Sequence, residues 1–130
     1  MVLPGIQALL GFQLIAVFNS GFSEKLSHGE QLLHLAAIVC MGLATILVMS
    51  PAALHRQREP RKISRRFLEI SSRLLMASMA PLAIGTTLDV YLIARAIAGP
   101  SVAAIVASGF ALAFLAFWVL LPRAIRLGNR

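Results

Sequence analysis

Four long runs of apolar residues, separated by shorter polar intervals, dominate the chain. The runs cover residues 3–22, 31–50, 72–94 and 102–121, and the longest polar interval is 55–66. A helix rises about 1.5 Å per residue, so about 20 residues cross a hydrocarbon core of roughly 30 Å. The pattern therefore predicts an all-α membrane protein with four transmembrane helices, forming a single domain over residues 1–130. Short connections predict two antiparallel hairpins.

Local signals mark where these helices begin and end. Ser27 followed by Glu30 matches a capping box, in which each residue binds a free N–H of the other. Ser64 is a predicted N-cap for the third helix. Proline lacks the N–H that a helix interior needs, so three positions are expected to end or kink helices. These are Pro51, Pro81 and Pro122.

Composition supports a bilayer environment. The 130 residues are 58% hydrophobic and 13% charged, with a mean hydropathy of +0.83. A soluble domain is about half apolar and about a quarter charged. A water-soluble fold of this size could not bury so much apolar surface. The single cysteine, Cys40, excludes a disulfide within the chain and is expected to pack as a small apolar residue.

The basic residues predict the orientation. Of the 12 Lys and Arg, Lys25 and Arg95 are on one side of the predicted membrane, and all the others are on the opposite side. Lys and Arg in short loops are retained in the cytoplasm. Both termini and the interval 55–66 are therefore expected to be cytoplasmic.

The same interval is a candidate contact for anionic lipid headgroups, at about 1 kcal/mol per basic residue near the surface. Its basic residues are Arg56, Arg58, Arg61, Lys62, Arg65 and Arg66. The alternative is that these charges only fix the topology. Nucleic acid is not an expected partner, because the membrane already explains the net charge of +7.

Three polar residues inside the apolar runs are the candidate intramembrane site: His34, Asp89 and Gln13. Polar groups in a bilayer are costly and often functional. At helical spacing Ser78, Gly85 and Asp89 share one face, and Asp89 is expected at a depth similar to His34. One hypothesis is a proton- or cation-responsive pair of His34 and Asp89. The other is hydrogen bonding that fixes helix packing.

No catalytic motif is present, so an enzyme is not expected, and neither is a cofactor. His28, His34 and Cys40 do not have the spacing of metal ligands, which argues against a metal site.

The segments LPGIQALLGFQLIAVFNSGF (3–22), EQLLHLAA (30–37) and SPAALHR (50–56), with a weaker match over 72–92, resemble an uncharacterised bacterial family of small four-span membrane proteins. The resemblance implies a bacterial cytoplasmic (inner) membrane, and members often carry the label of sodium:proton antiporter. Members usually have a cytoplasmic segment before the LPG, whereas this sequence starts almost at it, which leaves open whether such a segment is missing.

Two function hypotheses follow. The first is an accessory or structural membrane protein whose basic cytoplasmic face binds lipids or a partner. The second is an ion- or proton-translocating protein that uses the intramembrane polar residues. Four packed helices fill their own centre with side chains, so translocation would require a homo-oligomer, a larger membrane complex, or a narrow polar crevice near Asp89.

Overall fold

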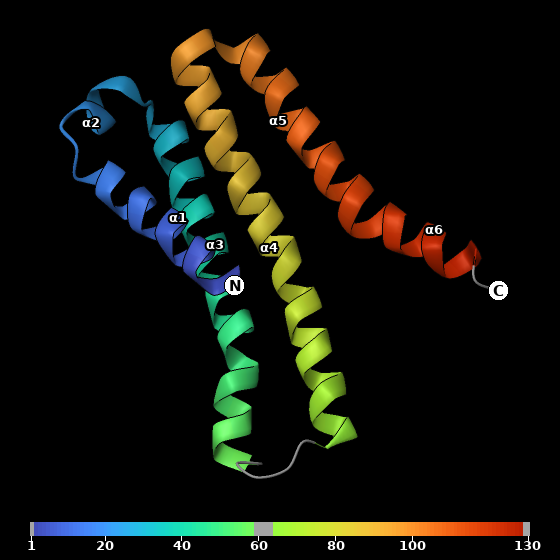
Figure 1. The fold of residues 1–130 in the computed structure, drawn as a ribbon. Coiled ribbons are helices and arrows are strands. Elements are labelled where there is room, and N and C mark those ends of the chain that lie inside the picture. The colour runs from blue at the N-terminus through green and yellow to red at the C-terminus, as the bar shows by residue number, and fades with distance from the viewer. Residues whose placement is uncertain (1, 59–63, 129–130) are drawn as a thin grey trace.

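The computed structural model describes residues 2–58 and 64–128, and all regular structure in these ranges is helical (Figure 1). The elements are α1 (Val2–Val17), α2 (Gly21–Lys25), α3 (His28–Arg58), α4 (Arg65–Ala98), α5 (Pro100–Leu115), the π-helical turn η1 (Ala116–Leu120) and α6 (Leu121–Gly128). The all-α prediction is confirmed.

The long helices α3 and α4 lie side by side and form the centre of the molecule (Figure 1). Their closest approach is at Gly85. A Cβ atom at this position would lie 3.2 Å from the carbonyl oxygen of Ala37 and 3.1 Å from Cβ of Cys40. Ala37 and Met41 are fully buried against this seam. A glycine is therefore required for this spacing, as in other close contacts between membrane helices.

Helix α1 packs across α3 and is shorter than the sequence predicted. Ile6 is 2% exposed and packs with Met41 and Ala44. The helix ends at Val17 instead of continuing to residue 22. Asn19 explains the difference, because its side-chain oxygen accepts a hydrogen bond from the N–H of Gly21 at 3.1 Å and stabilises a turn.

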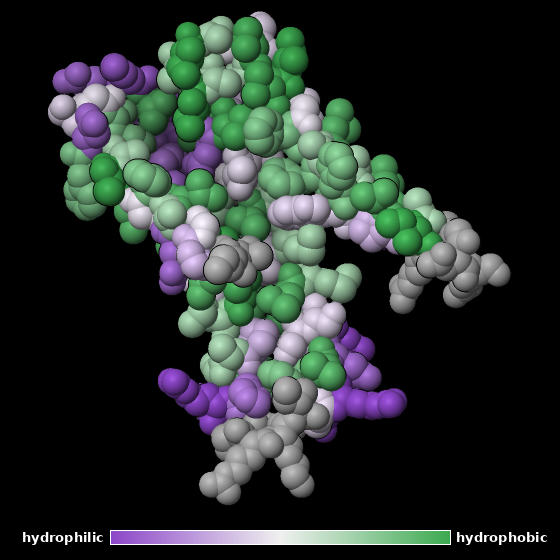
Figure 2. Space-filling model, in the orientation of Figure 1, coloured by the Kyte–Doolittle hydropathy of each residue, from purple (hydrophilic) through white to green (hydrophobic). Residues whose placement is uncertain are grey.

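Three helical segments of the described residues are long and apolar enough to cross a membrane: His28–Gln57, Arg65–Ala98 and Pro100–Ile125. The apolar part of α1, Leu3–Val17, falls below that length. Large apolar side chains are exposed around the helices, including Ile46 at 63% and Ile105 at 73%. Figure 2 shows this apolar surface between hydrophilic atoms at the two ends of the α3–α4 pair. These features are those of a membrane protein.

Helical structure continues through all three prolines, which corrects the predicted helix end at Pro122. Helix α3 continues through Pro51 to Arg58, and helical structure continues through Pro122 into α6. Leu121 bonds to the carbonyl of Ala116 in η1, five residues back. This wider turn makes room for the Pro122 ring, which clashes with the carbonyl four residues back in an α-helix. Pro81 also lies inside a continuous helix, α4.

The polar interval 55–66 is not a loop throughout. Residues 55–58 belong to α3, and Arg65 and Arg66 begin α4. The rings of His55 and Phe67 lie 5.3 Å apart and join the two helix ends. Arg61 and Lys62 lie outside the described residues, as does the side chain of Arg58.

Both predicted helix starts are confirmed. Ser27 donates its backbone N–H to Glu30 at 2.8 Å, and Glu30 donates its own to the Ser27 hydroxyl at 3.4 Å. The hydroxyl of Ser64 accepts from the backbone N–H of Phe67 at 3.1 Å. The register of α3 and α4 thus begins at defined residues.

Helix α5 contacts α4 beside their connection and then diverges from it (Figure 1). Gly99 has φ of 86°, a conformation that favours glycine, and makes the tight turn. Ala103 is fully buried just after the turn. Further along, the rings of Phe114 and Trp118 stand between the helices, with centroids 4.7 Å apart. The small Ala103 lets α5 lie close to α4 near the turn, and the large Phe114 and Trp118 keep the two helices apart further along.

The close contact at Gly85 generates a test. We expect Gly85→Val to lower the free energy of unfolding in detergent by about 1–3 kcal/mol, because the added atoms overpack the seam. Gly42→Val is the matched control, since nothing lies within 4 Å of a Cβ there. Thermal unfolding of both variants measures the difference, and equal losses would contradict the importance of this contact.

Candidate functional site

Three helices bring the predicted polar residues together. Gln13 lies in the last turns of α1, His34 in the second turn of α3, and Asp89 about one turn beyond Gly85 on α4. Helices α3 and α4 run in opposite directions and are closest at Gly85. His34 precedes Ala37 on α3, and Asp89 follows Gly85 on α4, so both residues lie on the same side of this contact. The close seam therefore places the His34 and Asp89 side chains at one level.

Gln13 contacts both partners. Its Nε2 donates to Oδ2 of Asp89 at 2.5 Å, and its backbone carbonyl oxygen lies 3.0 Å from Nε2 of His34. Nδ1 of His34 lies 3.8 Å from Oδ1 of Asp89. Gln13 and His34 are buried, and the Asp89 side chain is 17% exposed. We call Gln13, His34 and Asp89 the polar cluster.

The geometry constrains where the protons lie. A carbonyl oxygen only accepts, so Nε2 of His34 must carry the hydrogen in its contact with Gln13. In a neutral ring, Nδ1 is then an acceptor, and it faces the acceptor oxygen of Asp89. Two acceptors repel each other in a buried site.

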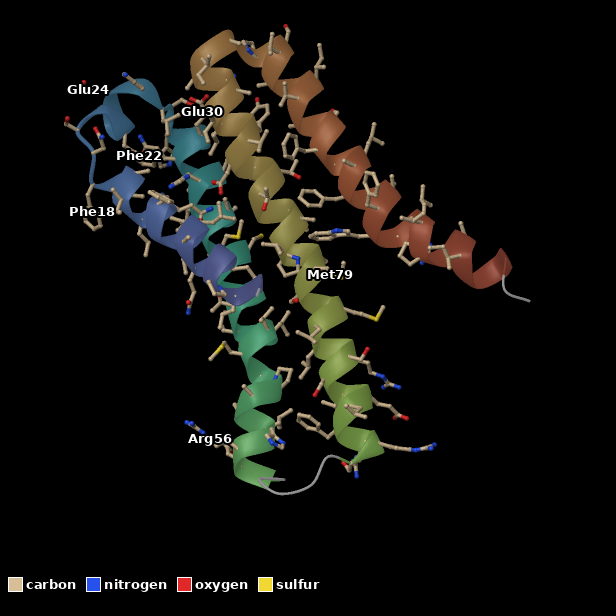
Figure 3. All side chains as sticks on the ribbon, viewed as in Figure 1. Phe18, Phe22, Glu24, Glu30, Arg56 and Met79 are labelled. Carbon is tan, nitrogen blue, oxygen red and sulfur yellow. The ribbon has the colours of Figure 1, made fainter. Side chains whose placement is uncertain are left out.

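One hydrogen-bonding atom of the cluster has no protein partner. Oε1 of Gln13 is buried without a hydrogen bond. An unpaired buried polar atom is costly, so this oxygen is a place where a water molecule would be stabilised. The ring of Phe22 closes the cluster from the side of α2, with its centroid 5.2 Å from that of His34 (Figure 3).

A charged pair lies between the polar cluster and the adjoining ends of the helices. Glu30 of α3 forms an ion pair with Arg95 of α4. The Ser27 hydroxyl also donates to Glu30 at 2.7 Å. The sequence analysis assigned Glu30 to capping and Arg95 to topology and did not predict their pairing. The signal was their position: Glu30 lies about one turn from His34 on α3, and Arg95 lies between one and two turns beyond Asp89 on α4.

The basic residues gather at the opposite end of α3 and α4. Arg56, Arg65 and Arg66 are exposed there. Arg56 projects from α3 on the side away from α4 (Figure 3). Hydrophilic atoms also concentrate at this end in Figure 2. We call Arg56, Arg65 and Arg66 the basic end.

The chemical capacity of the two sites differs. Within the described residues, no three His, Cys, Asp or Glu side chains are grouped as metal ligands. The polar cluster offers one acid, one imidazole and one amide, which suits proton exchange or structural hydrogen bonding. The basic end offers exposed cations, which suit anionic groups in solution or at a membrane surface.

Together, the membrane-length helices and the buried polar cluster define a small all-helical membrane protein. The chain belongs to DUF6328, a family of unknown function, whose model matches residues 1–122. This confirms the resemblance to an uncharacterised family. Comparisons with curated proteins and with solved structures give no match.

The Gln13–Asp89 hydrogen bond can be tested by a double-mutant cycle. We expect Gln13→Leu and Asp89→Leu to destabilise the protein singly and the double variant to lose less than the sum. The coupling should be about 0.6 kcal/mol, and up to about 1.7 kcal/mol. Gln7→Leu, at an exposed position of the same helix, is the control for general effects. Additive losses in thermal unfolding would exclude the bond as a link between α1 and α4.

Proposed function

We propose that this protein is an integral membrane protein with an accessory or structural role, whose basic end binds anionic lipid headgroups in the cytoplasmic leaflet. The observation that supports this most directly is the gathering of exposed Arg56, Arg65 and Arg66 where α3 ends and α4 begins. Among the described residues of that end, Glu69 is the nearest acid in sequence. The family resemblance suggests a bacterial cytoplasmic membrane.

The proposed topology has two antiparallel hairpins with both termini in the cytoplasm. The distribution of Lys and Arg supports it, because ten of the 12 fall on the side of the basic end. Helix α1 is too short to cross the membrane alone, so in this topology the turn after it and α2 would complete the crossing.

Sidedness can be measured in cells by cysteine labelling. In a Cys40→Ala background, we expect Lys25→Cys to react with a membrane-impermeant maleimide added outside, and Arg66→Cys to react only after permeabilisation. Labelling of both from the same side would contradict the topology.

Lipid binding by the basic end is expected to be electrostatic and therefore sensitive to salt. Each exposed arginine near an anionic surface contributes about 1 kcal/mol. The interaction between exposed charges weakens as the screening length shortens at high ionic strength.

The corresponding experiment counts phosphatidylglycerol and phosphatidylcholine retained by the purified protein in native mass spectrometry. We expect the wild type to prefer phosphatidylglycerol and the triple variant R56Q/R65Q/R66Q to lose most of that preference. Lys25→Gln, on the opposite side, is the charge-matched control and should retain it. Equal retention of the two lipids by the wild type would contradict the proposal.

A second candidate function is proton translocation through the polar cluster, alone or in an oligomer. The observation that favours it is the facing of Nδ1 of His34 and Oδ1 of Asp89 at 3.8 Å, which places an imidazole beside a carboxyl group. The Oε1 of Gln13, which belongs to the same cluster, is buried and unpaired. The alternative is that the cluster only holds α1 against α3 and α4.

Proteoliposomes with a pH-sensitive dye separate these alternatives. If the cluster carries protons, Asp89→Asn should abolish flux driven by a pH gradient while the protein stays folded, because an asparagine oxygen still accepts from Gln13. His34→Ala should also abolish it. Glu69→Gln removes the same charge at an exposed position of α4 and should leave flux unchanged. If the wild type shows no flux and the cluster variants are less stable, proton translocation is rejected and the cluster has a structural role.

A further inference from the structure

An apolar groove separates α4 from the diverging segment of α5, η1 and α6. It encloses about 1170 Å³ and is walled on one side by α4 residues, including Met79 and Ala83, and on the other by Phe114 and Trp118. Figure 3 shows Met79 on α4, and Figure 2 shows the α5–α6 segment standing away from α4. Within the hydrocarbon of a bilayer, such a groove is open to lipid.

The polar groups that line the groove are few. Thr87 is one, but its hydroxyl donates to the carbonyl of Ala83 at 2.7 Å, so its hydrogen is used within its own helix. Arg123 is the charged residue among the described residues that line the groove, and its side chain is exposed. The groove is therefore an apolar channel with a cation at one end.

The dimensions match one leaflet. The α4 wall runs from Met76 to Leu88, which is about 18 Å along a helix. Half of a hydrocarbon core of roughly 30 Å is about 15 Å. Because the chain turns back at Gly99 and α5 returns along α4, Arg123 lies towards the Met76 end of the groove, which is the end nearer the start of α4. Trp118 precedes Arg123 by five residues, between one and two helical turns. This order of cation, indole and apolar walls is the order of headgroup, carbonyl region and acyl chain in a lipid.

We propose that the groove binds an anionic phospholipid, with an acyl chain along Ala83 and Phe114 and the headgroup phosphate at Arg123. The proposal rests on the proposed membrane location, but it concerns a site separate from the basic end. Charge favours lipid over a second copy of the chain. The chain has five Asp and Glu, and of those in the described residues only Glu69 lies towards the Arg123 end of the groove.

The single tryptophan allows a test on the unaltered protein. The protein is reconstituted in phosphatidylcholine vesicles that contain a minor fraction of lipid with brominated acyl chains, which quench tryptophan fluorescence on contact. We expect brominated phosphatidylglycerol to quench Trp118 with an apparent affinity about fivefold above that of brominated phosphatidylcholine, the ratio that about 1 kcal/mol produces.

Variants identify the site. Arg123→Gln should remove the preference for phosphatidylglycerol, and Ala83→Phe should weaken quenching by both lipids because the ring fills the groove. Lys25→Gln removes an equal charge at an exposed position outside both proposed lipid sites and should keep the preference. Circular dichroism confirms that each variant folds.

Four results would overturn the proposal. Equal quenching by the two lipids in the wild type would exclude a headgroup site, and a preference that survives Arg123→Gln would place it elsewhere. Protection of Trp118 from both lipids, together with a dimer in detergent, would assign the groove to a second copy. Loss of the preference in the triple variant R56Q/R65Q/R66Q but not in Arg123→Gln would support the basic end while rejecting the groove.

Discussion

The approach of α3 to α4 at Gly85 is the constraint on which the rest of the arrangement depends. An added Cβ would meet Cys40, Ala37 and Met41 within 3.1–3.3 Å. Inside a bilayer there is no hydrophobic force to press helices together, so close packing and interhelical hydrogen bonds must do so. Glycine at this one position sets both the distance between the helices and their register.

That register determines the polar chemistry. Moving away from Gly85 in one direction, the paired positions are His34 with Asp89 and then Glu30 with Arg95. Each of these polar groups would be costly in hydrocarbon without a partner. Helix α1 is held to this pair by Gln13, whose side chain donates a hydrogen bond to Asp89 and whose backbone carbonyl oxygen contacts Nε2 of His34. The structural link and the candidate proton site are the same set of contacts, which is why stability and flux must be measured together.

The sequence predicted most of the helices because apolar runs and caps are local signals. Ser27 with Glu30 and Ser64 determine helix starts through contacts with residues three positions away. The three candidate polar residues were also identified locally, and the buried stripe of Ser78 and Gly85 was predicted from helical period. Pairing of Glu30 with Arg95 required the register between two helices, which a single sequence does not give. The predicted helix end at Pro122 was wrong because a π-turn at Ala116–Leu120 kept the chain helical.

The divergence of α5 shows how side-chain size is used differently in lipid and in water. In water, a gap lined by Met79, Ala83 and Phe114 would close or recruit another protein surface, because exposed apolar area is unfavourable. In a bilayer the acyl chains solvate such walls, so the gap needs no protein to fill it. The small Ala103 lies beside the Gly99 turn, and the large Phe114 and Trp118 lie where the helices are further apart. If the groove binds lipid as proposed, its occupant is selected through the polar group at its mouth, and Arg123 is then the residue that determines specificity.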